Sequence, residues 1–406
     1  MTSVPRLPPE LIALIFDCIV ADKDWPTLKS CAVLSSAYLP LARKRLFSEI
    51  TLRLRGSPNP IAIRDVVRRI QGLCDLLARN PDTSRCVRSI AVLDSYPVYD
   101  SQWITQQTAL PRLLDMLHHV RTLSFGCEVG YLQWSLFSVE LREALRTLFR
   151  SPLLTKLEVC NLGGVPGTAL NTSVRFMYLN NVNTLREDPV SAMFSMDQVE
   201  TGTVDPLPPT RDIRLCYLHI RTVSMVNTNS AWGVIEAHAD KLKFIRWRCW
   251  EDAQARDGVS FPGLLDLGKL PALRKLSVRM SYGKVGRDLL GFCDMLEAIT
   301  RPSSLRFLDL AILYPLQWNP HESHDLSTHE FWRRLAEVLL KSEYRTLHKV
   351  TVELTVHEKM CMWNGRRVNS VVEFRNKMKL TLRRLLNMST LHFKLKVHGF
   401  HLDAHE

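Results

Sequence analysis

The sequence predicts an α/β fold, in which three short amino-terminal helices precede an irregular series of helix-plus-strand units. An apolar, helix-forming stretch begins at Leu11, and an apolar pattern typical of strands recurs from Val87 to Met388. The composition is that of a globular protein, because 46% of the 406 residues are hydrophobic and 23% are charged. Wholesale disorder is therefore excluded.

The first helix is expected to begin close to Leu7-Pro8-Pro9-Glu10. Proline fits the first helical turn, whose N–H groups have no intrahelical partner, and Glu10 favours the positive end of the helix dipole. The run from Leu11 to Ala21 is apolar on every side of a helix, and such a helix must be buried all round. Two further helical pieces follow, at 27–34 and 37–47. So small a core is marginal alone, so its apolar surface must meet either the rest of the chain or another protein.

This segment resembles an F-box, in the form common in mushroom-forming fungi. The family opens with Leu-Pro, any residue, Glu and an aliphatic residue, and it ends with Leu plus an aromatic residue, here Leu46-Phe47. Tyr38 stands where the family usually has Trp, and Ser36 where it often has Arg. The resemblance covers about one eighth of the chain.

The resemblance implies that these helices dock on a Skp-type adaptor and so join the chain to a cullin ubiquitin ligase, while the remainder captures a protein substrate. It also implies which positions contact the adaptor. These are Leu7, Pro8, Glu10, Leu11, Leu14, Ile15, Ile19, Leu28, Cys31, Val33 and Tyr38.

We expect residues 1–50 to form the F-box-like domain, residues 51–86 a connecting segment that is partly helical, and residues 87–406 the substrate-binding domain. In the last of these, the pattern apolar-x-x-apolar-x-apolar recurs with a mean step of about 33 residues. By chance it occurs at roughly one position in ten of so hydrophobic a chain, but several copies follow a helical stretch and a break. The copies start at Val87, Val120, Leu154, Val174, Ile213, Leu242, Leu273, Leu305, Leu347 and Met388.

The clearest unit runs from Phe137 to Leu162, where a helix with one apolar face ends at Ser151-Pro152 and a strand of alternating apolar residues follows. A single unit of this kind cannot bury its own faces, but stacked neighbours can. The units therefore predict an irregular leucine-rich-repeat-like solenoid. The alternative is an ordinary α/β sheet domain built from the same units. Two stretches interrupt the series, an acidic loop at 183–212 and a His-rich loop at 314–330, and we interpret both as tolerated insertions.

No motif predicts bond chemistry. The patterns GxxxxGK[ST], GxSxG and HExxH are absent, and the glycine-rich stretch at 163–167 predicts a turn. Ten cysteines without a CxxC pair predict reduced, mostly buried thiols. We therefore expect no enzyme, no catalytic residue, no metal and no cofactor. One group of ligand-type residues lies among prolines and predicts a solvated loop: His321, Glu322, His324, Asp325 and His329.

The net charge is +12, from 53 Lys and Arg against 41 Asp and Glu, which permits binding to acidic surfaces. The basic clusters at 43–45 and 374–384 predict solvated helix faces, and Tyr217, Trp247 and Trp250 predict core packing. No signal peptide or bilayer-length apolar run is visible, so we expect no membrane contact and a cytoplasmic or nuclear location. The leading hypothesis is a ligase adaptor that does not bind nucleic acid. The alternative is a basic solenoid that binds nucleic acid or an anionic surface, with the amino-terminal helices only capping its core.

Overall fold

The fold is that of a computed structural model of the chain. It divides into two compact units, and each is described by itself. The first comprises Met1–Gly164, Thr172–Val174 and Pro206–Arg211, and the second Val165–Asn171, Arg175–Asp205 and Asp212–Glu406. The structure describes residues 8–34, 38–54, 60–94, 103–170, 174–185, 215–222, 225–249, 267–281, 287–299, 301–316, 330–358, 376, 378–380, 382–387 and 392–401.

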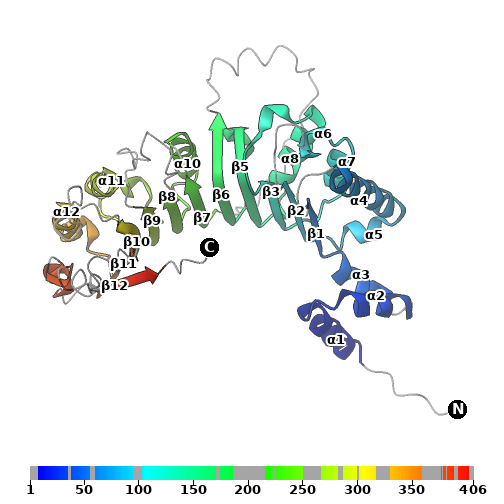
Figure 1. Ribbon diagram of the computed structural model, residues 1–406, viewed down its shortest axis with the longest axis horizontal. Helices are drawn as coiled ribbons and strands as arrows, with labels where there is room; N and C mark the ends of the chain where they lie inside the picture. The colour runs from blue at the N-terminus through cyan, green and yellow to red at the C-terminus, as the bar shows by residue number, and fades with distance from the viewer. Residues whose placement is uncertain are drawn as a thin grey trace, which may run out of the picture. The chain divides into compact units, whose positions relative to one another are not determined.

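The first unit begins with the three expected helices (Figure 1), which are α1 (Pro9–Ala21), α2 (Trp25–Leu34) and α3 (Leu39–Leu46). They share a small core of their own, in which Phe16, Leu28 and Ala42 are buried. Partly buried residues of the same segment pack against this core: Ile12, Ile19, Val20, Cys31, Ala32, Tyr38, Leu41 and Leu46.

The sheet of the first unit begins earlier than expected. Strand β1 (Glu49–Arg53) pairs in parallel with β2 (Ser89–Asp94), although we expected the strand-bearing region to start at Val87. Its apolar residues, Ile50 and Leu52, alternate with polar ones, which is the pattern of a half-buried strand. Two helices, α4 (Pro60–Arg79) and α5 (Pro81–Ser84), occupy the expected connecting segment.

The remainder of the first unit alternates helices and strands. Strands β1, β2, β3 and β5 are parallel neighbours in this order, and β4 pairs with β5. The clearest predicted unit is confirmed, because a helix capped by Ser138 is followed by β5. The turn predicted at 163–167 is wrong, because β5 continues through this glycine-rich stretch to Pro166. The elements are α6 (Trp103–Gln106), α7 (Ala109–Asp115), β3 (Thr122–Cys127), β4 (Leu132–Gln133), η1 (Trp134–Leu136), α8 (Val139–Phe149) and β5 (Lys156–Pro166).

The second unit carries strands β6 to β12, which are parallel neighbours in sequence order. The α/β class is thereby confirmed. The strands are β6 (Phe176–Leu185), β7 (Tyr217–Thr222), β8 (Phe244–Cys249), β9 (Lys275–Ser281), β10 (Phe307–Leu316), β11 (Lys349–Glu358) and β12 (His392–His401).

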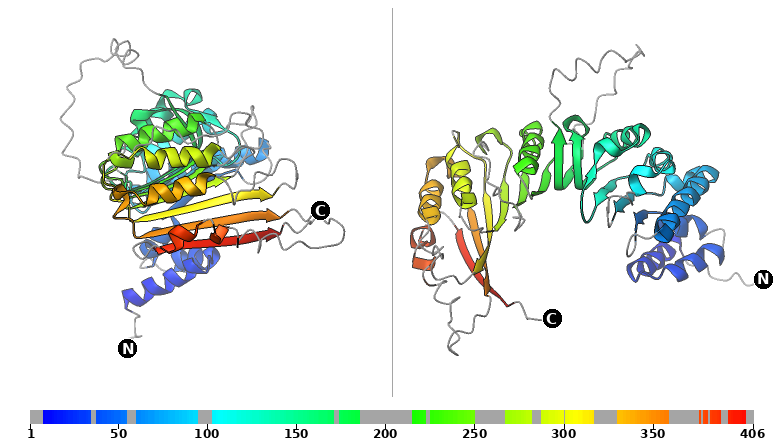
Figure 2. Two further views of the ribbon diagram at one scale, coloured as in Figure 1. Left: turned by 90° about the vertical axis from the view of Figure 1, so that its left-hand side faces the viewer. Right: turned by 45° about the horizontal axis from the view of Figure 1, so that its top comes forward.

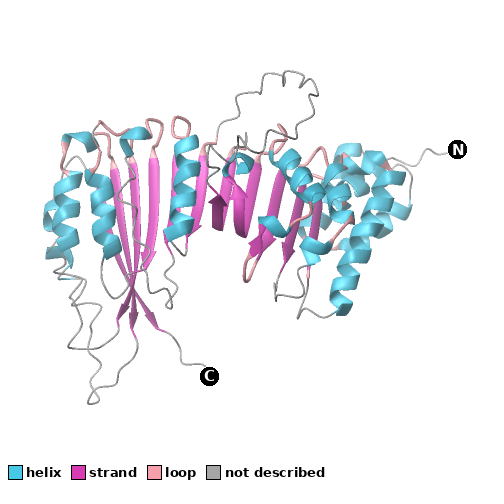
Figure 3. Ribbon diagram, turned by 90° about the horizontal axis from the view of Figure 1, so that it is seen from above, coloured by secondary structure: helices cyan, strands magenta, loops and turns pink. Residues whose placement is uncertain are grey.

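Helices α10, α11 and α12 lie along one face of these strands (Figure 2), and helix and strand alternate along each unit (Figure 3). Before β9 the described residues include a short 3-10 helix, η4. The second unit's helices are η2 (Gly167–Leu170), α10 (Met225–Ala237), η4 (Leu267–Lys269), α11 (Arg287–Glu297), α12 (Glu330–Leu339), η6 (Ser342–Tyr344) and α14 (Arg383–Leu386).

The recurring apolar pattern marks the buried side of the strands. On β8, for example, its three positions are Leu242, Ile245 and Trp247, all at most 1% exposed. Each strand from β8 to β11 begins two residues after the predicted pattern start. On β7 the buried set begins at Leu215, two residues beyond the predicted start at Ile213. The predicted start differs because this stretch is rich in apolar residues, so the same apolar pattern can begin at either Ile213 or Leu215.

Several sequence predictions fall on residues that the structure does not describe. They include Ile213 and Met388, most of the acidic loop at 183–212 and of the His-rich loop at 314–330, Trp250, and most of the basic segment at 374–384. Among the helices that the structure describes, none combines the length and the apolar character needed to cross a bilayer.

Candidate partner-binding surfaces

Helix α1 exposes a row of large apolar side chains to solvent. Leu11 is 45% exposed, Leu14 58% and Ile15 47%, whereas Phe16 on the opposite side is 3% exposed. Residues spaced by three or four positions share one side of a helix, so these three form one apolar face. Cys18, which is also exposed, extends that face by one turn. The small core therefore buries only one side of the apolar run, and the other side is exposed.

Helix α2 adds a second group of exposed apolar side chains. Trp25, at its start, is 41% exposed, and Val33 and Leu34, at its end, are 88% and 78% exposed. Together with Leu11, Leu14 and Ile15 they make up what we call the α1–α2 apolar surface. Single exposed apolar residues are ordinary, but a group of them on a small domain indicates an interaction site.

The predicted adaptor contacts divide by burial. Pro8 and Glu10 are exposed beside the α1–α2 apolar surface, and Ile19 and Cys31 are half-buried against the small core. Leu28 is completely buried, so its place is in the core and not at the surface. Leu7 lies outside the described residues.

Tyr38, in the position where the family usually has Trp, packs edge-on against Phe16, with the ring centroids 6.2 Å apart. It is half-buried, and it belongs to the core as much as to the surface. The substitution therefore keeps an aromatic ring inside the three-helix cluster.

Polar contacts fix the arrangement of the helices. Arg45 on α3 donates from Nε to Asp17 Oδ1 at 3.0 Å and from a guanidinium N–H to the carbonyl of Ala13 at 3.2 Å, and both acceptors lie on α1. At the start of α2, Asp24 accepts a hydrogen bond from the N–H of Thr27 at 3.2 Å. Hydrogen bonds from the Thr27 side chain and backbone lower the pKa of the Asp24 carboxyl. The exposed face of α1 is thus held in place from the opposite side.

A second candidate surface lies in the second unit, on the strand face away from α10, α11 and α12. Phe176, Tyr217 and Phe244 occupy the same register on β6, β7 and β8. The rings of Phe176 and Tyr217 are 6.0 Å apart, and those of Tyr217 and Phe244 are stacked at 4.5 Å. The row continues on β9 with Lys275, whose Nζ lies 5.4 Å from the Phe244 ring centroid.

Further along strands β7 to β9, the positions on this face are occupied by arginines and not by aromatic residues. Arg221, Arg248 and Arg279 occupy one register on β7, β8 and β9, and Arg246 precedes Arg248 by two residues on the same face. Burial, followed by the charges of Arg246, Arg279 and Arg221, lowers the pKa of Arg248. We call these four arginines, with Phe176, Tyr217 and Phe244, the arginine–aromatic face.

His219 lies inside this face, opposite Arg246 in register. Burial, together with the charges of Arg248 and Arg246, lowers its pKa to about 4. The imidazole is therefore neutral at pH 7 and adds no charge to the cluster. Its Nε2 is buried and has no hydrogen-bond partner among the described residues.

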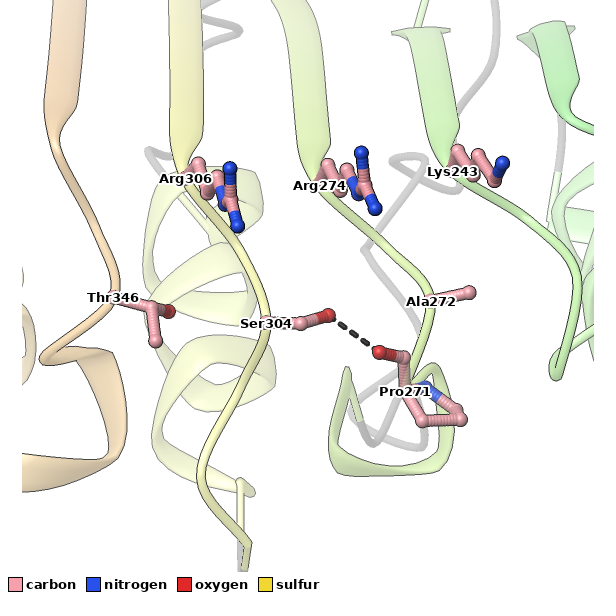
Figure 4. A pocket seen from close by; sticks show the side chains of 7 residues that line it. All are labelled: Lys243, Pro271, Ala272, Arg274, Ser304, Arg306 and Thr346. Carbon is pink, nitrogen blue, oxygen red and sulfur yellow. Dashed lines mark hydrogen bonds between the residues drawn. The ribbon is translucent and has the colours of Figure 1, made fainter.

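A second row of cations lies at the amino-terminal ends of β8, β9 and β10, around a cavity of about 210 Å³. Figure 4 shows Lys243, Arg274 and Arg306 on the same side of their strands, above Ser304 and Thr346. Backbone hydrogen bonds align the row, since the N–H of Arg274 donates to the Lys243 carbonyl at 2.9 Å and that of Arg306 to the Arg274 carbonyl at 2.8 Å. Ser304 Oγ donates to the Pro271 carbonyl at 2.6 Å, so this hydroxyl hydrogen is engaged.

The arginine–aromatic face is not among the surfaces that the sequence predicts. For Tyr217 and Trp247 the sequence predicts core packing. The structure confirms this for Trp247, which is 1% exposed and donates from Nε1 to Thr222 at 3.1 Å, whereas Tyr217 is half-buried on the open face. A signal was present, because the residue after the last buried position is Arg248 on β8 and Arg279 on β9, and it is Arg221 on β7 when that copy starts at Leu215.

No family model and no curated protein matches the chain. Within the part of the chain that the structure describes, no group of three or more His, Cys, Asp or Glu residues is placed to hold a metal ion. The ligand-type cluster from His321 to His329 lies outside that part.

Proposed function

We propose that the chain is a substrate-recognition adaptor of a Skp–cullin–F-box ubiquitin ligase. In this proposal α1–α3 are the F-box and dock on a Skp-type adaptor, while the helix-and-strand region is a leucine-rich-repeat-like solenoid that presents a surface to a protein substrate. The observation that carries it is the α1–α2 apolar surface on a helical cluster that already has its own core.

Burial energetics support a protein partner for this surface. Full burial of a Leu or Ile side chain contributes about 1.5–3 kcal/mol relative to exposure. Leu14 and Ile15 are each about half exposed, so both have much to gain from a partner. An adaptor helix or groove with apolar side chains is the partner that the F-box resemblance implies.

The proposed adaptor performs no bond chemistry of its own. By holding a substrate close to a ubiquitin-loaded enzyme it would raise the effective concentration of the two reactants. This role places the chain in the cytoplasm or nucleus, in agreement with thiols that remain free throughout the described residues.

Co-purification of the full chain with a Skp-type adaptor tests the proposal. We expect a stoichiometric complex on size exclusion, weakened about tenfold or more by Leu14→Asp with Ile15→Asp. The matched control is Ile61→Asp, because Ile61 on α4 is also a large exposed apolar residue, at 66%. Absence of a complex at micromolar concentration, or equal weakening by the control, would contradict the proposal.

A nucleic-acid-binding role is the second candidate, and the four clustered arginines are the observation that favours it. Polyphosphate binding weakens steeply as salt rises, because each neutralised phosphate releases counterions. A binding constant for a single-stranded oligonucleotide that falls at least about a hundredfold between 50 and 200 mM salt would support this role over the adaptor role.

A further inference from the structure

We propose that the arginine–aromatic face of β6–β9 binds an extended acidic segment of a partner protein that also carries an apolar side chain. The identification of that segment as part of a ligase substrate rests on the proposed adaptor role. The binding chemistry itself does not, because it follows from the charges and rings on this one face.

Three arginines of this face lack an acidic partner. Among the described residues, no carboxylate pairs with Arg246, Arg248 or Arg279. Asp309, on the adjacent β10, pairs instead with Lys275 at 2.7 Å. Arg248 Nε is buried and has no hydrogen-bond partner among the described residues. A bound carboxylate would relieve the repulsion among the arginines.

The arrangement of the guanidinium groups fits an extended segment better than a single small anion. Neighbouring strands are about 4.8 Å apart, so Arg221, Arg248 and Arg279 span about 10 Å across β7–β9. Side chains on one face of a sheet stand roughly parallel, so the three form a line and not a ring. A line of cations matches carboxylates at alternate positions of an extended peptide, because those side chains point to the same side.

The aromatic row supplies the apolar part of the site. Phe244, Arg246 and Arg248 follow one another at alternate positions of β8, so the rings and the arginines share one surface. The stacked pair of Tyr217 and Phe244 supplies apolar surface next to the cations. Aromatic and arginine side chains together are the groups that dominate binding energy at protein interfaces.

A nucleic acid fits this face less well. Polynucleotide binding relies on a long basic track that neutralises many phosphates. Here the arginine row ends on β10 with Ala311 and meets Glu353 on β11 in the same register, and Asp309 lies one row away. The basic track is therefore short, which suits a short acidic peptide better than a continuous phosphate backbone.

Selection of random 12-residue peptides displayed on phage, with the purified full chain as bait, tests the inference. We expect the enriched peptides to combine several Asp or Glu residues with an aromatic or aliphatic residue. Binding of one synthesised peptide should weaken about tenfold or more in Arg248→Glu with Arg279→Glu. Arg279→Glu alone should give a smaller loss, and it alters only an exposed side chain.

The control variant, Arg64→Glu with Arg79→Glu, makes the same charge change at two exposed positions of α4 and should bind the peptide within about twofold of wild type. Enrichment of neutral peptides, no enrichment, or equal losses in both variants would overturn the inference. So would a 12-nucleotide single-stranded DNA that binds more tightly than the peptide through the same arginines. Formation of the complex with the Skp-type adaptor is assayed in parallel. If that complex does not form but the peptide still binds, only the adaptor role is overturned.

Discussion

The pKa of His219 depends on the residues around it. It is half-buried on β7, its ring lies 5.6 Å from that of Tyr178, and Arg246 and Arg248 on β8 are its charged neighbours. Burial and these two charges oppose protonation, which is why its pKa falls to about 4. The imidazole of His219 is neutral at pH 7 and adds no charge to the face, but its low pKa makes the stability of the fold sensitive to acid.

We expect the free energy of unfolding to fall as the pH is lowered from about 6.5 to about 4, because over that range the unfolded chain binds a proton at His219 that the folded chain does not. Above pH 6.5 this contribution is fully present. The loss is about 1 kcal/mol after allowance for partial solvent exposure.

Urea unfolding at pH 7.5, 5.5 and 4.5 measures the effect, and His219→Gln should remove part of it. His238→Gln is the comparison, because burial also lowers the pKa of His238 and gives a separate contribution of the same sign. If wild type and His219→Gln lose the same stability over this range, the assignment to His219 is wrong.

Thiol reactivity should follow exposure. Burial raises the pKa of Cys127 and of Cys293 to about 12, whereas Cys18 is exposed on the apolar side of α1. We expect maleimide to modify Cys18 within minutes and to leave the two buried thiols unmodified in the native protein, because only an accessible thiolate reacts.

Mass spectrometry of timed samples would measure this order. Protection of Cys18 by a bound Skp-type adaptor would map the contact to α1. Modification of Cys127 or Cys293 as fast as Cys18 would show that the sheet is more open than described.

At the scale of the element, α1–α3 form a cluster whose stability depends on few residues. We expect Leu28→Ala to destabilise it by about 2–4 kcal/mol, because Leu28 is completely buried at its centre. Val33→Ala, on the same helix but 88% exposed, should change stability by less than about 0.5 kcal/mol. Hydrogen exchange of the amides of α1–α3 would report the difference, and equal protection in both variants would contradict a separate core.

One arginine joins α11 and α12 through hydrogen bonds. Arg334 on α12 donates to Glu297 at 2.6 Å and to Asp294 at 2.7 Å, both on α11, and these hydrogen bonds raise its pKa. We expect Arg334→Met to destabilise the second unit by about 1–3 kcal/mol, since two carboxylates then lose their shared partner.

The neighbouring Arg333 is the control. It pairs with Glu330 and Glu337 on its own helix and is 61% exposed, so Arg333→Met should cost less than about 0.5 kcal/mol. Thermal unfolding of the two variants, followed by circular dichroism, compares them. Equal shifts in Tm would mean that the contact between α11 and α12 contributes little.

For the molecule as a whole, the two candidate surfaces differ in chemistry, one apolar and the other cationic. We expect a rise from 50 to 500 mM NaCl to weaken acidic-peptide binding about tenfold or more, because salt screens exposed charges. The adaptor complex should change by less than about threefold, since burial of apolar area is little screened. Titrations at both salt concentrations measure the two affinities, and a parallel loss would show that charge dominates both.

Local sequence sufficed for most of the elements. The spacing of Leu141, Leu145 and Leu148 predicts α8 because helical periodicity is a property of neighbouring residues, and the recurring apolar pattern predicts strands for the same reason. The local sequence was less informative for β1, because its alternation of apolar and polar residues extends over only a few positions. It also did not predict where the buried positions of β7 begin, because the apolar stretch there allows the pattern to start at either of two residues.

Neighbouring residues alone predict that helix-and-strand units follow an amino-terminal segment with more apolar surface than its own core can cover. Which side of α1 remains exposed depends on tertiary packing, because the packing of Phe16 against Leu28 and Ala42 turns Leu11, Leu14 and Ile15 outward. The arginine–aromatic face was likewise decided in three dimensions. Arg221, Arg248 and Arg279 are distant in the chain and become neighbours only through the register of parallel strands, which depends on pairing between segments and not on any one of them.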